Sequence, residues 1–139
     1  MVVTMDPTGS DGHRDHARIA EATTTATRRW SGGRRPVRLY HWFLPRALMA
    51  RWAHHLAALD PDSVYQEVEL GRPDGDATTV LDTSAHLDRV RAAMARHASQ
   101  RSPYEGMPVE LEAAFLSTSH LRRVLPMWAG GPRETSLLA

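Results

Sequence analysis

Short apolar runs alternate with longer amphipathic stretches along most of this chain, and this alternation restricts its fold more than any other feature. Residues 1–5 and 37–43 are rich in β-branched or aromatic side chains, which favour strands. Residues 15–30 and 46–59 instead place apolar or small side chains three and four positions apart, as amphipathic helices do. Strands that alternate with helices are typical of a sheet with helices packed on it. The sequence therefore predicts an α/β sandwich with a largely parallel sheet.

The pattern continues less regularly in the second half of the chain. Further segments are assigned in the same way: strands at 64–70 and 77–81, a helix after Asp82-Thr83-Ser84 with Leu87, Val90 and Met94 as its buried stripe, a short helix or strand at 109–116, and an apolar packing segment at 121–128. Beyond residue 126 the chain contains Gly-Gly-Pro and few apolar anchors. We therefore expect one domain over residues 1–126 and a flexible tail over residues 127–139.

Composition excludes several classes of function. The 139 residues are 42% hydrophobic and 24% charged, as in a single soluble globular domain. The net charge is only +1 and no basic block stands out, so nucleic acid is not an expected partner. Cysteine is absent, which excludes disulfides and thiolate chemistry. The sequence shows neither an apolar run of about 18 residues nor a signal peptide, so we expect no membrane association and a cytoplasmic location.

The strongest candidate for chemistry is the pair His13 and His16, with Asp15 between them. These residues follow the first expected strand and open the first expected helix, where α/β folds tend to place ligands. Residues three apart share a helix face, so both imidazoles can point into one site. Asp11 can cap the helix, and the helix dipole favours neutral imidazole, the form that binds metals. A metal or acid–base site and a merely polar helix start both fit this pattern.

The remaining aromatic and histidine side chains have simpler interpretations. Trp30, Trp42, Trp52 and Trp128 are better explained as core residues than as a sugar-binding platform, although Trp42 lies near a strand end, where it can stack on a ring. His54 and His55 fit the surface of the expected helix 46–59. Asp82 fits a helix cap about as well as a substrate-facing carboxylate.

Several short segments, taken in order, resemble the later half of the PIG-L/LmbE family. The segments that carry the resemblance are Gly12-His13-Arg14-Asp15-His16, Leu39-Tyr40, Val80-Leu81-Asp82-Thr83-Ser84, the helix Leu87 to Met94, and His97-Ala98-Ser99-Gln100. The resemblance covers roughly residues 1–126. It implies a zinc-dependent de-N-acetylase acting on N-acetylglucosaminyl or related amides. It also implies a Rossmann-like three-layer α/β sandwich with a mostly parallel sheet.

The resemblance assigns roles to three residues. His16 matches the family's zinc-binding histidine. His13 matches the histidine that, as a cation, polarises the amide carbonyl or protonates the leaving amine, and Asp15 matches the carboxylate that orients it. Arg14 stands where the family usually has proline, which is common but not required in a first helical turn.

One family motif does not occur in the sequence. The motif Ala-His-Pro-Asp-Asp, which in this family supplies two of the three metal ligands and the general base, is absent, and no histidine precedes His13. A catalytic zinc needs about three protein ligands and a bound water. Because the chain also opens within an expected core strand, we expect an incomplete domain with an incomplete Zn²⁺ site.

Two functions fit these observations. In the first, the chain is a truncated metal-dependent hydrolase that removes an acetyl group from a small-molecule amide or amino-sugar conjugate. In the second, it is a non-catalytic half-domain that is inactive alone or pairs with a chain supplying the missing metal ligands. A complementing chain or a homo-oligomer is the partner that the second alternative requires, because a sheet that lacks strands has an open edge.

Overall fold

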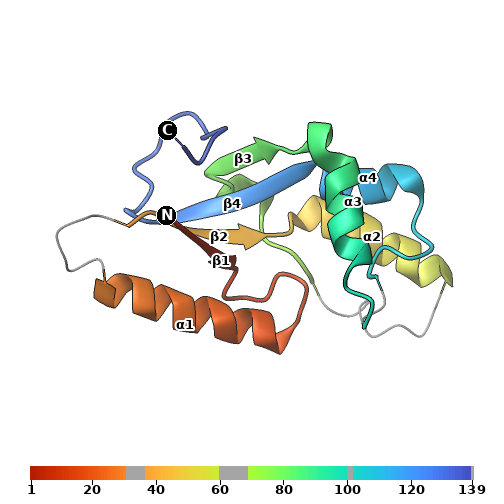
Figure 1. The fold of residues 1–139 in the computed structure, drawn as a ribbon, viewed down its shortest axis with the longest axis horizontal. Helices are drawn as coiled ribbons and strands as arrows, with labels where there is room; N and C mark the ends of the chain where they lie inside the picture. The colour runs from red at the N-terminus through yellow and green to blue at the C-terminus, as the bar shows by residue number, and fades with distance from the viewer. Residues whose placement is uncertain (31–36, 60–68, 100–101, 139) are drawn as a thin grey trace.

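The computed structural model describes residues 1–30, 37–59, 69–99 and 102–138 of the chain (Figure 1). Its elements in order are β1 (Val2–Met5), α1 (Arg14–Trp30), β2 (Leu39–Phe43), α2 (Arg46–Leu59), the 3-10 turn η2 (Asp74–Asp76), β3 (Thr79–Asp82), the 3-10 turn η3 (Ser84–His86), α3 (Leu87–Ala95), α4 (Val109–Leu116) and β4 (Thr118–Leu125). The mixed α/β class and most expected elements are confirmed. The strand expected at 64–70 falls largely outside the described residues, and Gln100 lies outside them too.

The four strands form one sheet in the order β1-β2-β4-β3. The pair β1–β2 is parallel, whereas β4 runs antiparallel to its two neighbours β2 and β3, so β1, β2 and β3 share one direction. The expected mostly parallel sheet is therefore interrupted by the antiparallel strand β4. The reason is that α3 and α4 follow β3 and bring the chain back to the same end of the sheet at which β3 ends. Asp82, the last residue of β3, pairs with Thr118, the first residue of β4, so β4 must run back along β3.

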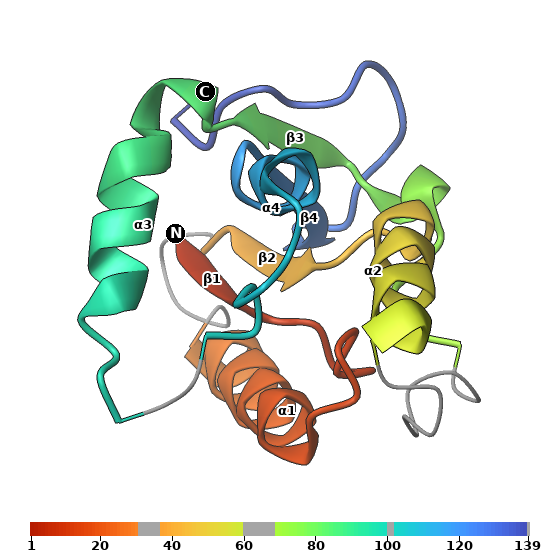
Figure 2. The same cartoon turned by 90° about the vertical axis from the view of Figure 1, so that its right-hand side faces the viewer.

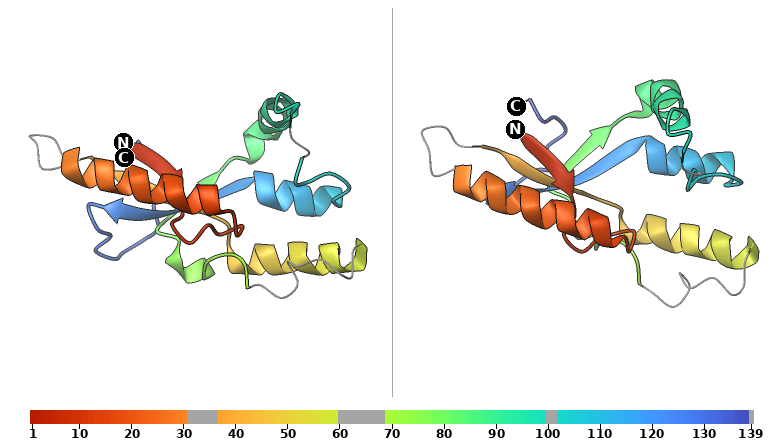
Figure 3. Two further views of the ribbon diagram at one scale, coloured as in Figure 1. Left: turned by 90° about the horizontal axis from the view of Figure 1, so that it is seen from below. Right: turned by 60° about the horizontal axis from the view of Figure 1, so that its bottom comes forward.

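The helices do not form two layers around the sheet. Helix α1 lies against the face of β1 and β2, where the hydroxyl Oγ1 of Thr24 lies 2.8 Å from Nε2 of His41 (Figure 3). Helices α2, α3 and α4 instead gather beyond the ends of the strands (Figure 2). The three-layer, Rossmann-like arrangement is therefore not confirmed. No helix among the described residues is both long enough and apolar enough to cross a membrane.

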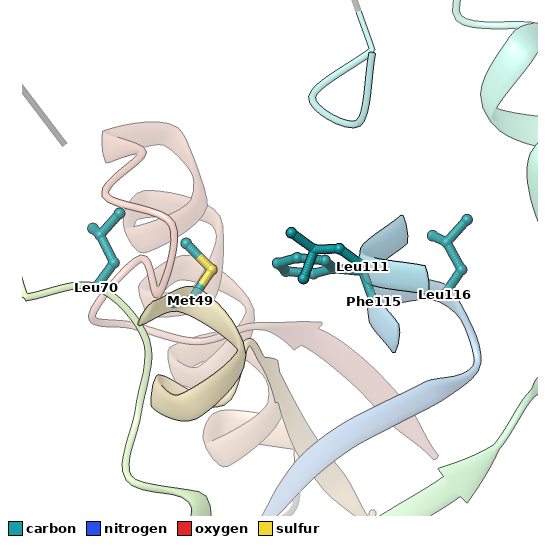
Figure 4. Close-up of a cluster of buried hydrophobic side chains, with 5 residues drawn as sticks. All are labelled: Met49, Leu70, Leu111, Phe115 and Leu116. Carbon is teal, nitrogen blue, oxygen red and sulfur yellow. The ribbon is translucent and has the colours of Figure 1, made fainter. Parts of the chain in front are cut away.

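One apolar cluster lies between these helices, while Leu39, Phe43 and Leu121 are buried on the sheet. Its buried members are Met49, Leu70, Leu111, Phe115 and Leu116 (Figure 4). Leu87, Val90 and Met94, which the sequence places on one stripe of α3, pack against this cluster while staying partly exposed. Helix α3 buries no residue completely, so it contributes one side of the cluster without being enclosed.

The segment expected to be a flexible tail contacts the sheet through Glu134 and Trp128. Glu134 forms a parallel bridge with Thr79, and its carboxylate accepts a 2.6 Å hydrogen bond from the Thr79 hydroxyl. The same carboxylate pairs with Arg123 of β4 at 2.7 Å. The guanidinium of Arg123 also lies 4.6 Å from the ring centre of Trp128.

Candidate functional site

The loop between β1 and α1 carries His13, leads into the helix turn with His16, and is held by a buried ionic cluster. The carboxylate of Asp6 is fully buried and accepts hydrogen bonds of 3.0 and 3.2 Å from Nη1 of Arg72. Arg72 also donates to Oδ2 of Asp76, at 2.6 Å from Nη2 and 3.0 Å from Nε. Asp6 further accepts hydrogen bonds from the backbone and hydroxyl of Thr8. The start of the loop is therefore fixed by residues more than 60 positions away in the sequence.

Two further contacts fix the middle of the loop. The backbone oxygen of Ser10 accepts a 2.8 Å hydrogen bond from Gly71, and its hydroxyl accepts a 3.0 Å hydrogen bond from the backbone N–H of Leu44. Gly9 has φ +57°, and a Cβ there would lie 2.8 Å from the carbonyl oxygen of His13. Only glycine fits this position without strain.

His13 caps helix α1 with its own ring. Its Nδ1 accepts a 3.2 Å hydrogen bond from the backbone N–H of Asp15, because the first turn of a helix leaves N–H groups without partners. Asp11, expected to be the cap, instead accepts a hydrogen bond from the backbone N–H of His13 at 3.1 Å. An Nδ1 that accepts a hydrogen bond carries no proton, so Nε2 of a neutral His13 is the donor. The Asp15 carboxylate lies 4.0 Å from Nδ1, too far for a hydrogen bond.

His16 lies beside His13 on the same face of the helix, as its spacing predicts. The two ring centres are 4.8 Å apart with a tilt of 32°. Nδ1 of His16 is buried and lies 2.6 Å from Oδ2 of Asp11, and it has no hydrogen-bond partner among the described residues. The short distance makes Asp11 the ionic neighbour of this ring. With Nδ1 facing a carboxylate, Nε2 is the nitrogen left to meet a ligand.

The residues around His16 fit one metal ligand but not a complete metal centre. A metal-binding imidazole usually donates the N–H of its second nitrogen to a carboxylate, and Asp11 lies 2.6 Å from Nδ1 of His16, where such a carboxylate would stand. A zinc centre needs about three protein ligands. Within the described ranges, no group of three His, Asp or Glu side chains is arranged to hold a metal ion.

A cavity of about 980 Å³ opens beside the two histidines. Its polar lining consists of Asp11 and His13 from the β1–α1 loop, Arg14 and His16 from the first turn of α1, and His97 after α3. Its other walls come from β1 and β2, from helices α2, α3 and α4, and from the loop before α4. The larger side chains on those walls are Trp42, Met49, Trp52, Met94, Tyr104 and Phe115. Trp42 and Trp52 therefore line the cavity half-buried, whereas Trp30, expected in the core, is 76% exposed.

Sequence reasoning missed several residues of this site. Tyr104 lies in a loop without periodicity, yet its ring contacts Phe115 at 5.4 Å between ring centres. Burial, and then the negative charges of Asp11 and Glu112, raise the pKa of Tyr104, so its hydroxyl stays protonated at neutral pH. Asp6 and Arg72 carry no local motif either. The position of Asp6 directly after an expected strand is the signal that could have pointed to it.

Comparison with curated proteins finds several relatives that carry the same name. Over 172 aligned residues the chain is 31% identical to a 1D-myo-inositol 2-acetamido-2-deoxy-alpha-D-glucopyranoside deacetylase of Kineococcus radiotolerans, covering 100% of this chain and 45% of the relative. A deacetylase of the same name from Saccharomonospora viridis is 38% identical over 106 residues, with 72% of this chain and 37% of the relative covered. The one from Gordonia bronchialis is 27% identical over 146 residues, covering 99% of this chain and 52% of the relative.

The chain thus spans about half, or less, of the length of these curated relatives. No protein-family model matches it, and no solved structure matches it. The similarity includes the segment with His13 and His16 where it covers the whole chain. The chain is thus similar, over its whole length, to part of a protein that is named as a deacetylase of an acetamido sugar linked to inositol.

Proposed function

We propose that this chain belongs to the PIG-L/LmbE-like de-N-acetylases and carries one side of a hydrolytic site. The proposed reaction removes an acetyl group from an N-acetylglucosaminyl-type or related small-molecule amide. The observation that carries the proposal is the pair of adjacent imidazoles at a large cavity, in a chain similar over its whole length to a named deacetylase.

His13 is the residue we assign to the amide. In hydrolysis the carbonyl oxygen gains negative charge as water adds to the carbon, and a hydrogen-bond donor at that oxygen stabilises the charge. Because Nδ1 of His13 accepts from the backbone, Nε2–H is available as this donor. A protonated His13 would lose that acceptor at Nδ1 and would need the carboxylate of Asp15, now 4.0 Å away, as its partner. Asp15 is thus the positioning residue for the charged form.

His16 is the residue we assign to a metal, with Asp11 as the carboxylate that orients its ring. Zinc bound there would supply a Lewis acid and an activated water. The described residues do not complete such a centre.

The second candidate is a non-catalytic chain that pairs with another polypeptide. It is favoured by the incomplete ligand set and by the edge of the sheet at β1, which pairs only with β2 among the described strands. An unpaired edge is a template for another strand. A partner that added a strand there, together with two further ligands, would complete the site.

The two candidates are separated by measuring acetate release from an N-acetylglucosaminyl glycoside in the presence of zinc. The assay uses the chain alone and the chain co-expressed with the part of the Kineococcus relative that it does not cover. We expect His13→Ala to lower any activity about 10²- to 10⁴-fold. Arg18→Ala is the control, since Arg18 is exposed and pairs only loosely with Glu21.

Release by the chain alone supports the hydrolase, whereas release only by the co-expressed pair supports the pairing chain. Absence of release from both preparations refutes the proposed reaction. Zinc content gives a second readout: we expect less than one zinc per chain alone, and stoichiometric zinc that His16→Ala abolishes would contradict the incomplete site.

A further inference from the structure

The cavity of about 980 Å³ has an apolar floor and a polar rim. Met49 and Phe115 are buried members of the apolar cluster and form part of the floor. Trp42 and Trp52 are half-buried in the same cavity, and their faces can pack against the ring carbons of a sugar. The polar side chains of the cavity are half-buried or exposed and form its rim, which consists of Asp11, His13, Arg14, His16 and His97. A ligand therefore meets apolar surface inside the cavity and charged or hydrogen-bonding groups at its opening.

Three of the five rim residues already have a role in the proposed function. Nδ1 of His13 accepts a hydrogen bond from the helix backbone, which leaves Nε2–H for the amide. Nδ1 of His16 lies 2.6 Å from the carboxylate of Asp11, which leaves Nε2 for a metal. The proposed function therefore leaves Arg14 and His97 without a role.

Arg14 is a cation that no acidic side chain neutralises. Within the part of the chain that the structure describes, its guanidinium forms no hydrogen bond and no ion pair. The carboxylate of the next residue, Asp15, is 88% exposed and lies within ion-pair distance of His13 instead. Arginine stays charged at every physiological pH, so this charge is available to a ligand. The PIG-L/LmbE family usually has proline at this position, so the cation is a departure of this chain from the family pattern.

His97 brings a second donor to the same cavity. It follows α3, far from Arg14 in the sequence, and both side chains line the cavity. An imidazole carries an N–H in either neutral tautomer and two when it is protonated. Among the described residues, no hydrogen bond or ion pair engages the ring of His97. The planar fork of an arginine matches two oxygens of one carboxylate or phosphate, so the rim is suited to an anionic group.

We propose that Arg14 binds a carboxylate or a phosphate carried by the amino-sugar conjugate, with His97 as a second donor, while the acetamide of the same molecule meets His13. This inference rests on the proposed function, because that function makes an acetamide the group at His13. It names the substrate more narrowly, as an N-acetylated amino sugar with an acidic substituent. Carboxylate and phosphate share the paired anionic oxygens that a guanidinium recognises. Arg14 is then a specificity-determining residue.

The test compares three acetamides by isothermal titration calorimetry with the 139-residue chain. Methyl N-acetylglucosaminide is neutral, N-acetylmuramic acid carries a carboxylate, and N-acetylglucosamine 6-phosphate carries a phosphate. The buffer is free of metal ions, because a bound metal ion would itself attract an anion. We expect at least one of the two anionic ligands to bind about tenfold more tightly than the neutral one. The tighter of the two shows which anion the rim fits better.

Substitutions connect this preference to the rim. Arg14→Gln should remove the preference, whereas Arg14→Lys, which keeps the charge without the fork, should keep part of it. His97→Ala should weaken binding of the anionic ligand about two- to threefold. Arg18→Gln is the matched control, because Arg18 lies one turn later on α1, pairs with Glu21 and is not among the residues that line the cavity. Far-ultraviolet circular dichroism verifies that each variant is folded, and Arg14→Lys and His97→Ala carry the test if Arg14→Gln is not.

Equal binding of the neutral and anionic ligands would overturn the inference, as would an unchanged preference in the folded Arg14 variants. Absence of binding of all three ligands would overturn it too. The measurement is independent of turnover. A preference that depends on Arg14, without acetate release from the preferred ligand by the co-expressed pair, would refute the proposed reaction alone. Acetate release at the same rate from all three ligands would refute the role of Arg14 alone.

Discussion

Replacing Arg72 by methionine should destabilise the protein more than any replacement of an exposed arginine. Arg72 is 15% exposed and Asp6 is fully buried, and their atoms approach to 3.0 Å. Removing the guanidinium leaves the Asp6 carboxylate with its Thr8 contacts only. Breaking a buried pair by removing one partner costs about 3–5 kcal/mol. Because Arg72 keeps some contact with solvent and Asp6 keeps Thr8, we expect a loss of about 3 kcal/mol in the free energy of unfolding.

The assay is urea-induced unfolding followed by tryptophan fluorescence. Arg18→Met is the matched control: its pair with Glu21 is 83% and 69% exposed, so we expect a loss of only about 0.2–0.5 kcal/mol. The double variant Asp6→Asn/Arg72→Met removes both charges and should be more stable than the sum of the two single losses predicts. If the two variants Arg72→Met and Arg18→Met differ by less than about 1 kcal/mol in their free energy of unfolding, the cluster does not act as a buried ion pair and the reasoning fails.

Three further predictions follow from other parts of the fold. Burial lowers the pKa of His41 below its usual 6.5, so the unfolded chain takes up the proton first. Stability should therefore be full above about pH 6.5 and fall as the pH drops below it, and His41→Gln should flatten this dependence in urea titrations at pH 7.5 and 5.5. Gly71→Ala should lower the free energy of unfolding by about 1–3 kcal/mol, because Gly71 has φ +83° and a Cβ would lie 2.8 Å from the backbone at the start of α2. Gly75→Ala, with open space around it, should melt like the wild type, and equal melting temperatures for both variants would contradict the backbone argument. Glu134→Ala should lower the free energy of unfolding by about 1–3 kcal/mol, because the buried Thr79 hydroxyl loses the carboxylate that it donates to. The variant should also be cleaved faster in its tail by trypsin. An unchanged cleavage rate would show that Glu134 does not anchor the tail.

Much of the candidate site is local and could be predicted from sequence. His13 and His16 lie on one face because three residues span most of a helical turn, and the first helix begins directly after His13. The choice of hydrogen-bond partners could not be predicted in this way. Both Asp11 and His13 are able to cap the helix, and the path of the loop selects His13.

The sequence by itself determined the helices and strands of the first 59 residues and the helix after residues 82–84, because apolar periodicity and breaking residues act over a few positions. Only the tertiary structure decided that 118–125 enters the sheet as its third strand and runs antiparallel, since this depends on where α3 and α4 leave the chain. The same holds for the cavity. Trp52, Met94 and Phe115 come from three helices, and the Asp6–Arg72 pair that holds the site loop spans most of the first half of the chain. Such contacts have no local pattern, because they arise only when distant segments pack together.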